Sequence, residues 1–215
     1  MSHISDALEN LFKEAVHCQF CFDNGWVSHS LINMAQPRWI GTQYYSSEPK
    51  ILIILLNPGS GGDTRRANKR LLALLEGYKD GENTIDEIFQ HQAQDIHNWG
   101  RGKFANFYLR GLNLSLQNIA FANIAWCASA GNSYPNPMLS ECFNRHTSPL
   151  IQSLSPDIAI LSGNNVHRYG EVIRRLSPNT QIIPTVHYAH RKGYSVERQE
   201  LERVRKLISD YSVKN

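Results

Sequence analysis

The stretch ILIILLNPGSGGD, at residues 51–63, constrains the fold of this chain more than any other part of the sequence. Residues 51–56 are all apolar and rich in isoleucine, which is typical of a central strand in a parallel sheet that is covered on both faces. Asn57 and Pro58 end this run, and the glycines that follow allow the backbone to approach a ligand closely. Because ligands of α/β folds bind at the carboxyl ends of strands, residues 57–63 form the first candidate binding loop.

The rest of the sequence alternates helical and strand-like patterns. Apolar residues at helical spacing predict helices over residues 4–16, 64–76, 85–96, 104–112, 139–154, 166–175 and 196–211. Shorter apolar runs predict further strands over residues 119–127, 157–163 and 181–187. This order predicts an α/β protein, a three-layer α/β/α sandwich with a central, mostly parallel four-stranded sheet, in one domain over residues 1–215. Loops 127–137 and 187–193 then join loop 57–63 as candidate binding loops.

Composition and charge indicate an ordinary globular protein. Hydrophobic residues make up 41% of the 215 residues, and the longest apolar run is too short to span a bilayer. The N-terminal segment carries acidic residues and no signal-peptide core, so we expect an intracellular, cytoplasmic and nucleoid-associated protein. The net charge is only +3, but basic residues cluster at 65–70 and 190–192. Such clusters fit phosphate-bearing partners, and equally a solvated surface.

The four cysteines form two widely separated pairs. Cys18 and Cys21 have the C-x2-C spacing that lets two thiolates reach one metal or cluster, whereas Cys127 and Cys142 lie far along the chain. Disulfides are disfavoured inside cells, so ligation and simple burial are the two open interpretations. A site shared by all four cysteines requires the whole fold to bring them together.

The glycine loop admits several interpretations. A nucleotide-binding P-loop is excluded, because the G-x4-G-K-[ST] pattern and its lysine are absent. NPGSGG, at residues 57–62, resembles the opening motif of lipid and diacylglycerol kinases, but their later G-G-D-G-T nucleotide loop is missing. A plain strand-to-helix turn that uses glycine for its positive φ is a further possibility.

A second resemblance covers most of the chain, from about residue 18 to residue 194. LLNPG, at residues 55–59, resembles motif one of the uracil-DNA glycosylase superfamily. The iron–sulfur members of that superfamily have a C-x2-C near the N-terminus, and later a strand with N-x3-C and a fourth cysteine in the next helix. The corresponding segments here are NIAWC at 123–127, ASAGNSYPNP at 128–137 and SEC at 140–142. SPDIAILSGNNVHRYG at 155–170 and IPTVHYAHRKGY at 183–194 resemble two further family segments.

In motif one, the resemblance implies that Asn57 positions the attacking water, with Pro58 and Gly59 shaping the turn that binds substrate. The iron–sulfur branch has an acidic residue one place earlier, where this chain has Leu56, so Asn57 is the polar candidate. Asp63 either polarises water or caps the next helix, and the cap is the favoured role.

Asn123 matches the base-reading asparagine of the family, because an amide offers both the donor and the acceptor that uracil requires. His187 matches the histidine that donates a hydrogen bond to O2 of the departing uracil. Tyr188 stands where the family has proline, and the family's wedge residue is missing. We therefore expect His190, Arg191 or Tyr194 to fill the vacated place or to bind phosphates, and single-stranded or otherwise altered DNA becomes a favoured substrate.

The resemblance also implies a stacking aromatic and a bound cofactor. The candidates for stacking on the flipped base are Trp99, Phe104, Phe107, Tyr108 and Tyr45, most of which we expect in the core. The four cysteines, Cys18, Cys21, Cys127 and Cys142, are implied to bind a structural 4Fe–4S cluster, with zinc as the rival.

Together these expectations describe a monomeric DNA-repair enzyme. The resemblance implies a monofunctional glycosylase of base excision repair that hydrolyses the N-glycosidic bond of uracil or a related deaminated base in DNA. The alternative is a catalytically silent, nucleic-acid-binding relative that keeps the iron–sulfur cluster.

Overall fold

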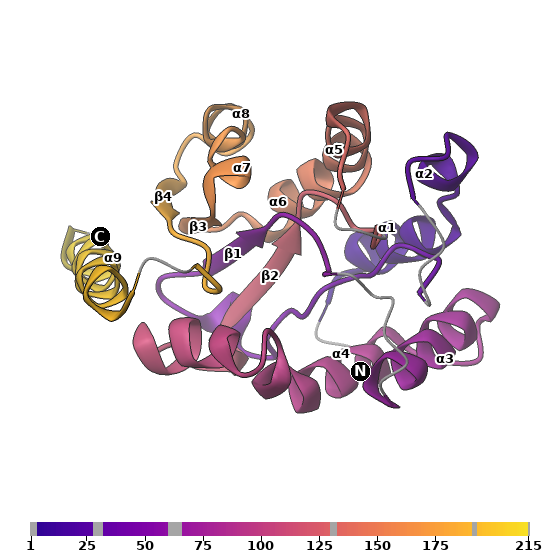
Figure 1. Cartoon of the computed structure of the whole chain (residues 1–215), viewed down its shortest axis with the longest axis horizontal. Coiled ribbons are helices and arrows are strands. Elements are labelled where there is room, and N and C mark those ends of the chain that lie inside the picture. The colour runs from indigo at the N-terminus through magenta and orange to yellow at the C-terminus, as the bar shows by residue number, and fades with distance from the viewer. Residues whose placement is uncertain (1–3, 28–31, 60–65, 130–132, 191–192, 215) are drawn as a thin grey trace. The chain divides into compact units, whose positions relative to one another are not determined.

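A computed structural model describes residues 4–27, 32–59, 66–129, 133–190 and 193–214 (Figure 1). The chain divides into two compact units, each built from three stretches. The cysteine unit contains Met1–Trp39, Leu56–Gln92 and Ala122–Ser153, and the sheet unit contains Ile40–Leu55, Ala93–Phe121 and Leu154–Asn215. The single domain expected over residues 1–215 stays a prediction.

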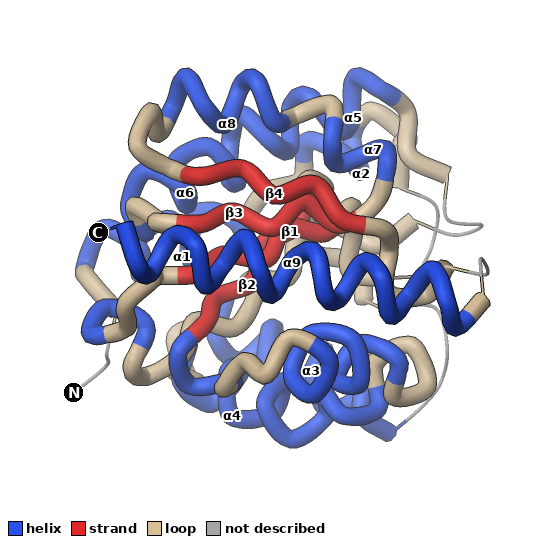
Figure 2. The backbone as a smooth tube through the Cα atoms, turned by 90° about the vertical axis from the view of Figure 1, so that its left-hand side faces the viewer, coloured by secondary structure: helices blue, strands red, loops and turns tan. Residues whose placement is uncertain are grey.

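A sheet of four parallel strands occupies the middle of the fold. The strands are β1 (Ile51–Leu55), β2 (Ile119–Asn123), β3 (Ile158–Ser162) and β4 (Gln181–Thr185), and their order is β2-β1-β3-β4 (Figure 2). β1 has a neighbouring strand on each side, and all five of its residues are buried. This position explains why the apolar run at 51–56 is continuous rather than alternating.

Helices make up most of the remaining described residues. The α-helices are α1 (Asp6–His17), α2 (Phe20–Asp23), α3 (Arg66–Asp80), α4 (Ile85–Asp95), α5 (Asn136–Cys142), α6 (Ser148–Leu154), α7 (Asn164–His167), α8 (Gly170–Leu176) and α9 (Tyr194–Lys214). Shorter 3-10 or π segments are η1 (Tyr44–Ser46), η2 (Ile96–Asn98), η3 (Ala105–Gly111), η4 (Leu116–Asn118) and η6 (Phe143–Thr147). None of the helices in the described part of the chain has the length and apolar character that crossing a membrane requires.

Helices cover both faces of the sheet within the sheet unit. On one face, Gly170 of α8 lies so close that an added Cβ would stand 3.4 Å from Leu161 and 3.5 Å from Ile182. Thr185 is three residues beyond Ile182 in the same strand and therefore points to the other face, where its side chain meets Glu200 of α9. The predicted three-layer α/β/α architecture is confirmed, with a sheet that is parallel throughout.

Several predicted element boundaries are wrong. The strand expected over 119–127 ends at Asn123, whose carbonyl accepts a hydrogen bond from the Thr147 hydroxyl (2.6 Å). The helix expected over 166–175 is two helices, since Tyr169 closes a tight turn on Val166 (N to O, 3.0 Å) between α7 and α8. The helix expected over 139–154 begins earlier, at Asn136, and contains a π segment.

Aromatic side chains fill the core of the cysteine unit. Phe12 of α1 packs edge-on against Phe89 of α4 with ring centres 5.8 Å apart, and lies 6.0 Å from Trp126. The Trp126 indole N–H donates to the Thr147 hydroxyl (3.0 Å), which in turn donates to the Asn123 carbonyl. Thr147 is fully buried, and its hydroxyl is a hydrogen-bond partner for two polar groups of the core, the indole N–H of Trp126 and the carbonyl of Asn123.

Replacing Thr147 with valine is expected to lower the free energy of unfolding by about 1–3 kcal/mol. Valine keeps the volume of the side chain but neither accepts from the indole of Trp126 nor donates to the carbonyl of Asn123. Urea-induced unfolding measures the change. Thr42→Val is the matched control, because that hydroxyl is exposed and donates to Gln117, and we expect a change below about 0.5 kcal/mol. Equal losses in the two variants would contradict this account of the core.

Candidate functional site

The turn after β1 is shaped by Asn57, Pro58 and Gly59. The side-chain oxygen of Asn57 accepts the backbone N–H of Gly59 at 2.7 Å, which closes a turn of two residues. Gly59 has φ of +84°, a value that favours glycine, and an added Cβ there would meet nothing within 4 Å. The turn thus needs glycine for its backbone angle, and it fixes the orientation of the Asn57 carboxamide.

The amide of Asn123 lies beside this turn, in the same unit. Asn123 is buried, and its hydrogen bonds are satisfied when its oxygen accepts from Nε of Arg38 (2.8 Å) and its nitrogen donates to the carbonyls of Asn57 and Ala122 (3.3 Å each). Arg38 is itself buried, with 6% of its surface exposed. The structure therefore brings the two predicted asparagines together, with Arg38 as a third member of the group.

The four cysteines converge from four places in the cysteine unit. Cys18 caps the end of α1, Cys21 lies in α2, Cys127 follows β2, and Cys142 ends α5. The thiol of Cys21 is hydrogen-bonded with the thiols of Cys127 and Cys142. Cys18 lies close enough for negative charge on its sulfur to raise the pKa of both Cys127 and Cys142. All four are free cysteines, and only Cys18 is partly exposed.

The surroundings favour negative charge on the sulfur of Cys21 but oppose it on Cys127 and Cys142. The pKa of each of these two thiols is raised well above its ordinary value by the hydrogen bond with Cys21 and by burial. The pKa of Cys21 is lowered to about 4, mainly by its hydrogen bond with Cys127 and to a lesser extent by that with Cys142. Cys142 accepts the backbone N–H of Trp126 at 3.0 Å. The Arg145 guanidinium, which stacks 4.2 Å above the ring of Phe20, adds positive charge nearby. Of Cys21, Cys127 and Cys142, it is therefore Cys21 that is held as a thiolate.

The residue types of this cluster are those of a thiolate metal site, but their arrangement in the structure is not. Cysteine thiolates are the ligands that an iron–sulfur cluster or zinc uses in proteins. Among the described residues, no group of three or more His, Cys, Asp or Glu side chains is arranged to hold a metal ion. The thiol of Cys21 instead forms hydrogen bonds with the thiols of Cys127 and Cys142.

His187 stands two residues beyond the end of β4, in the sheet unit. Its Nδ1 accepts the backbone N–H of Ala189 at 3.2 Å, so the neutral ring carries its proton on Nε2. The carbonyl of His187 accepts the N–H of His190 at 2.8 Å, which folds the loop back on itself. This geometry leaves Nε2–H as the donor that a developing negative charge needs.

Two neighbours determine where the imidazole of His187 lies. Gly163 has φ of +89°, and an added Cβ would stand 3.3 Å from Cβ of His187. Tyr188 lies against the imidazole with ring centres 4.3 Å apart, and its ring also packs 5.3 Å from that of Phe104. Tyr188 therefore anchors the loop in an aromatic cluster.

The pKa of His187 is below its ordinary value because its ring is partly removed from water and because His190 is close. A lowered pKa keeps the imidazole neutral to a lower pH. We expect the nuclear magnetic resonance (NMR) titration midpoint of His187 to lie below about 6.5. A short peptide with the sequence of residues 184–190 serves as the reference. A midpoint at or above that of the peptide would contradict this assignment.

The predicted stacking aromatics are mostly core residues. Phe104, Phe107 and Tyr108 are at most 1% exposed, and they pack against one another. Trp99 is partly exposed and packs edge-on to Phe104, while Tyr45 is 47% exposed. Among these five, only Trp99 and Tyr45 have surface to offer a base.

The predicted site residues fall into two groups. Asn57, Pro58, Gly59, Asn123 and the four cysteines belong to the cysteine unit, and His187 belongs to the sheet unit. Asp63 and Arg191 lie outside the described residues. That Asn57 faces His187 across a cavity stays a prediction.

Sequence reasoning missed Arg38, Tyr188 as an anchor, and the residues that support His187 from α7 and α9. For Arg38, the available signal was a basic residue inside the stretch MAQPRWI, at residues 34–40, which is otherwise apolar or weakly polar. Tyr134 was also missed; its hydroxyl accepts the N–H of Ser129 at 3.1 Å, close to Cys127.

Comparison with known proteins adds no family assignment: no family model matches this sequence, and no curated protein is significantly similar to it.

Proposed function

We propose that this chain is a monofunctional DNA glycosylase that hydrolyses the N-glycosidic bond of uracil or a related deaminated base. The observation that carries the proposal is the meeting of Cys18, Cys21, Cys127 and Cys142 in the unit that also pairs Asn57 with Asn123. The resemblance to the iron–sulfur uracil-DNA glycosylases requires both groupings, although the residues involved are spread over more than a hundred positions.

In the proposed reaction, water attacks the anomeric carbon of the sugar, the C–N bond breaks, and uracil leaves as an anion with the electron pair. The proton that the attacking water loses passes through solvent and neutralises the uracil anion. Asn57 positions the water through the second lone pair of its side-chain oxygen, because the first lone pair already accepts the backbone N–H of Gly59. His187 donates from Nε2 to O2 of the departing uracil, where the negative charge develops. The imidazole acts in its neutral form.

Asn123 distinguishes uracil from cytosine in this proposal. Its amide already bonds with Arg38 and with the carbonyl of Asn57, so an entering base exchanges these bonds for its own donors and acceptors. Because the amide is buried, a base that fails to replace the lost bonds leaves polar groups without partners, which is costly. That cost is a source of selectivity.

The four cysteines would hold a 4Fe–4S cluster, with zinc as the rival group. When bound, it would join the α1–α2 segment to β2 and α5 as a structural crosslink, because hydrolysis of the base transfers no electron. We propose DNA as the partner, single-stranded DNA included, a monomeric state and a cytoplasmic, nucleoid-associated location.

A gel assay on a uracil-bearing oligonucleotide, single- and double-stranded, tests the proposal. The expected result is strand scission after alkali with the wild type and little scission with Asn57→Ala. Asn144→Ala, an exposed asparagine of η6 in the same unit, serves as the matched control and should retain activity. Absence of scission with every deaminated base tested would overturn the activity.

A second candidate is a catalytically silent, nucleic-acid-binding relative. The bonds that already engage the Asn123 amide and the Asn57 oxygen favour it, because in a silent protein these side chains would serve the fold alone. This candidate predicts DNA binding that weakens steeply with salt, together with intact glycosidic bonds.

A further inference from the structure

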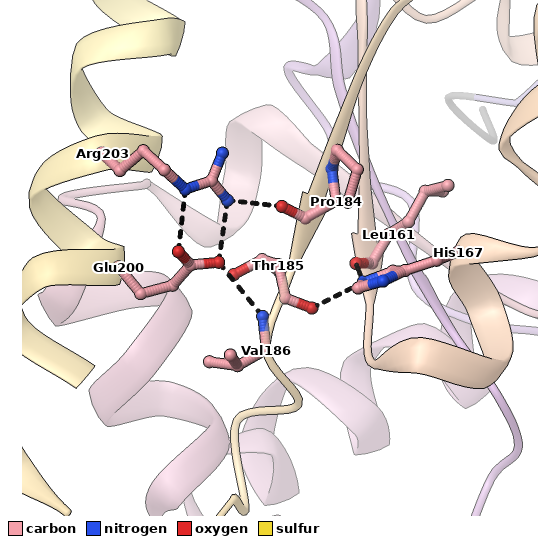
Figure 3. A network of polar contacts seen from close by, with 7 residues as sticks. All are labelled: Leu161, His167, Pro184, Thr185, Val186, Glu200 and Arg203. Atoms are coloured by element: carbon pink, nitrogen blue, oxygen red, sulfur yellow. Dashed lines mark hydrogen bonds and ion pairs between the residues drawn. The ribbon is translucent and has the colours of Figure 1, made fainter. Parts of the chain in front are cut away.

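The peptide group between Thr185 and Val186, immediately before His187, is held on both of its polar atoms. The Thr185 carbonyl accepts the backbone N–H of Gly163 (2.8 Å) and Nε2 of His167 on α7 (2.9 Å). The Val186 N–H donates to a carboxylate oxygen of Glu200 on α9 (3.2 Å). Figure 3 shows the bonds from His167 on α7 and from Glu200 on α9 converging on the end of β4.

Glu200 is in turn oriented by Arg203. Nε and Nη2 of Arg203 donate to the two carboxylate oxygens of Glu200, each at 2.8 Å, and Nη2 also donates to the Pro184 carbonyl (Figure 3). The side chain of Glu200 is only 15% exposed. The bonds from Arg203 are the main reason why the pKa of Glu200 is lowered, so the carboxylate is ionised. A forked pair of this kind fixes the position of the carboxylate more firmly than a single contact does.

His167 binds the same strand end from the other side. Its Nε2 lies 3.1 Å from the Leu161 carbonyl as well as 2.9 Å from the Thr185 carbonyl, so one N–H is shared between the ends of β3 and β4. The backbone that carries His187 is thereby fixed to a neighbouring strand, to α7 and to α9.

A second ion pair on α9 shows by contrast what is special about Glu200. Arg198 and Glu202 lie 3.5 Å apart on the same helix, with side chains 68% and 59% exposed. Such an exposed pair contributes little to stability. The pair of Glu200 and Arg203 differs because it binds backbone atoms of residues 184 and 186, on the approach to His187.

We propose that Glu200, held by Arg203, is a positioning residue for His187. Glu200 fixes the Val186 N–H, and with it the point from which the imidazole projects, while the Ala189 N–H fixes the tautomer of the ring. The proposal rests on the proposed function, in which the Nε2–H of His187 must meet the charge on the departing base. It assigns to α9 a role in catalysis that the sequence motifs do not contain.

The test compares Glu200→Ala and Glu200→Gln with Glu202→Gln as the matched control. Steady-state kinetics on a uracil-bearing oligonucleotide are measured, together with the NMR signals of the His187 ring nitrogens. We expect Glu200→Ala to lower kcat about 10- to 100-fold with KM within about twofold, and to shift the His187 signals. Glu200→Gln keeps an acceptor for the Val186 N–H and should recover part of the loss. Glu202→Gln should match the wild type in both measurements.

The outcomes separate this proposal from the proposed function. If the wild type releases no base, the proposed function fails, but shifted His187 signals in Glu200→Ala and unshifted signals in Glu202→Gln still support the positioning of the ring. If Glu200→Ala does not fold, Arg203→Gln and Glu200→Gln give the same comparison. Unchanged His187 signals and unchanged kcat in folded Glu200 variants would overturn the proposal and leave Glu200 with a structural role only.

Discussion

Replacing His187 with phenylalanine is expected to lower kcat for base release by about 100- to 1,000-fold. Phenylalanine keeps a flat ring that can still pack against Tyr188, but it has no N–H to donate to O2 of the departing uracil. The loss belongs to the transition state, where the negative charge develops, so KM should change far less than kcat. Single-turnover kinetics on a uracil-bearing oligonucleotide measure the chemical step directly.

His97→Phe is the control for the His187 variant. His97 is an exposed histidine of η2 in the same unit, so the same change of residue type is made away from the loop that follows β4. This variant should release base at the wild-type rate. If His187→Phe stayed within about threefold of the wild type, the imidazole would not be the donor and the role assigned to His187 would be wrong.

Replacing Cys142 with alanine is expected to remove the bound inorganic group and to lower the thermal midpoint of unfolding by about 10 °C or more. Cys142 is buried at the end of α5, and its loss leaves three thiols where the proposed group needs four. Anaerobically purified wild-type protein should contain about four iron atoms per chain, or about one zinc if the rival group is bound. The variant should contain less than a quarter of the wild-type amount.

Ser140→Ala is the control for the cysteine variant, because Ser140 is exposed on the same helix two residues away. It should match the wild type in metal content and in the midpoint of unfolding. Wild-type protein with neither iron nor zinc, or a Cys142→Ala protein with full metal content, would contradict the proposed thiolate site. Elemental analysis distinguishes iron from zinc in the same experiment.

The architecture could be predicted because it depends on patterns that are local in the sequence. The continuous apolar run at 51–56 indicated a strand with neighbours on both sides, and β1 is that strand. The partner of the Asn123 carbonyl at the end of β2 could not be predicted, because Thr147 lies 24 residues away in the sequence. Contacts of this kind leave no local signal in the sequence.

The candidate site was predictable in part, and for a similar reason. The spacing of Cys18 and Cys21 suggested a thiolate site, but only the fold brings Cys127 and Cys142 to them. The residue type of Asn123 tells which hydrogen bonds the amide can make, whereas the structure shows that Arg38 and the Asn57 carbonyl already use them.

The supports of His187 were the least predictable part of the site. His167 and Glu200 bind backbone atoms rather than side chains, so no pairing of residue types in the sequence points to them. Their roles depend on where β4 ends relative to α7 and α9, which is a property of the assembled sheet unit.

The most direct test of the central claim is to incubate the wild-type protein with a single-stranded, uracil-bearing oligonucleotide in heavy-oxygen water and to analyse the products by mass spectrometry. The expected result is free, unlabelled uracil together with an abasic strand that carries one heavy oxygen on the sugar, because water attacks the anomeric carbon. Oligonucleotides that keep uracil and every other deaminated base tested, whether single-stranded or paired with a complementary strand, would contradict the claim that this protein is a glycosylase.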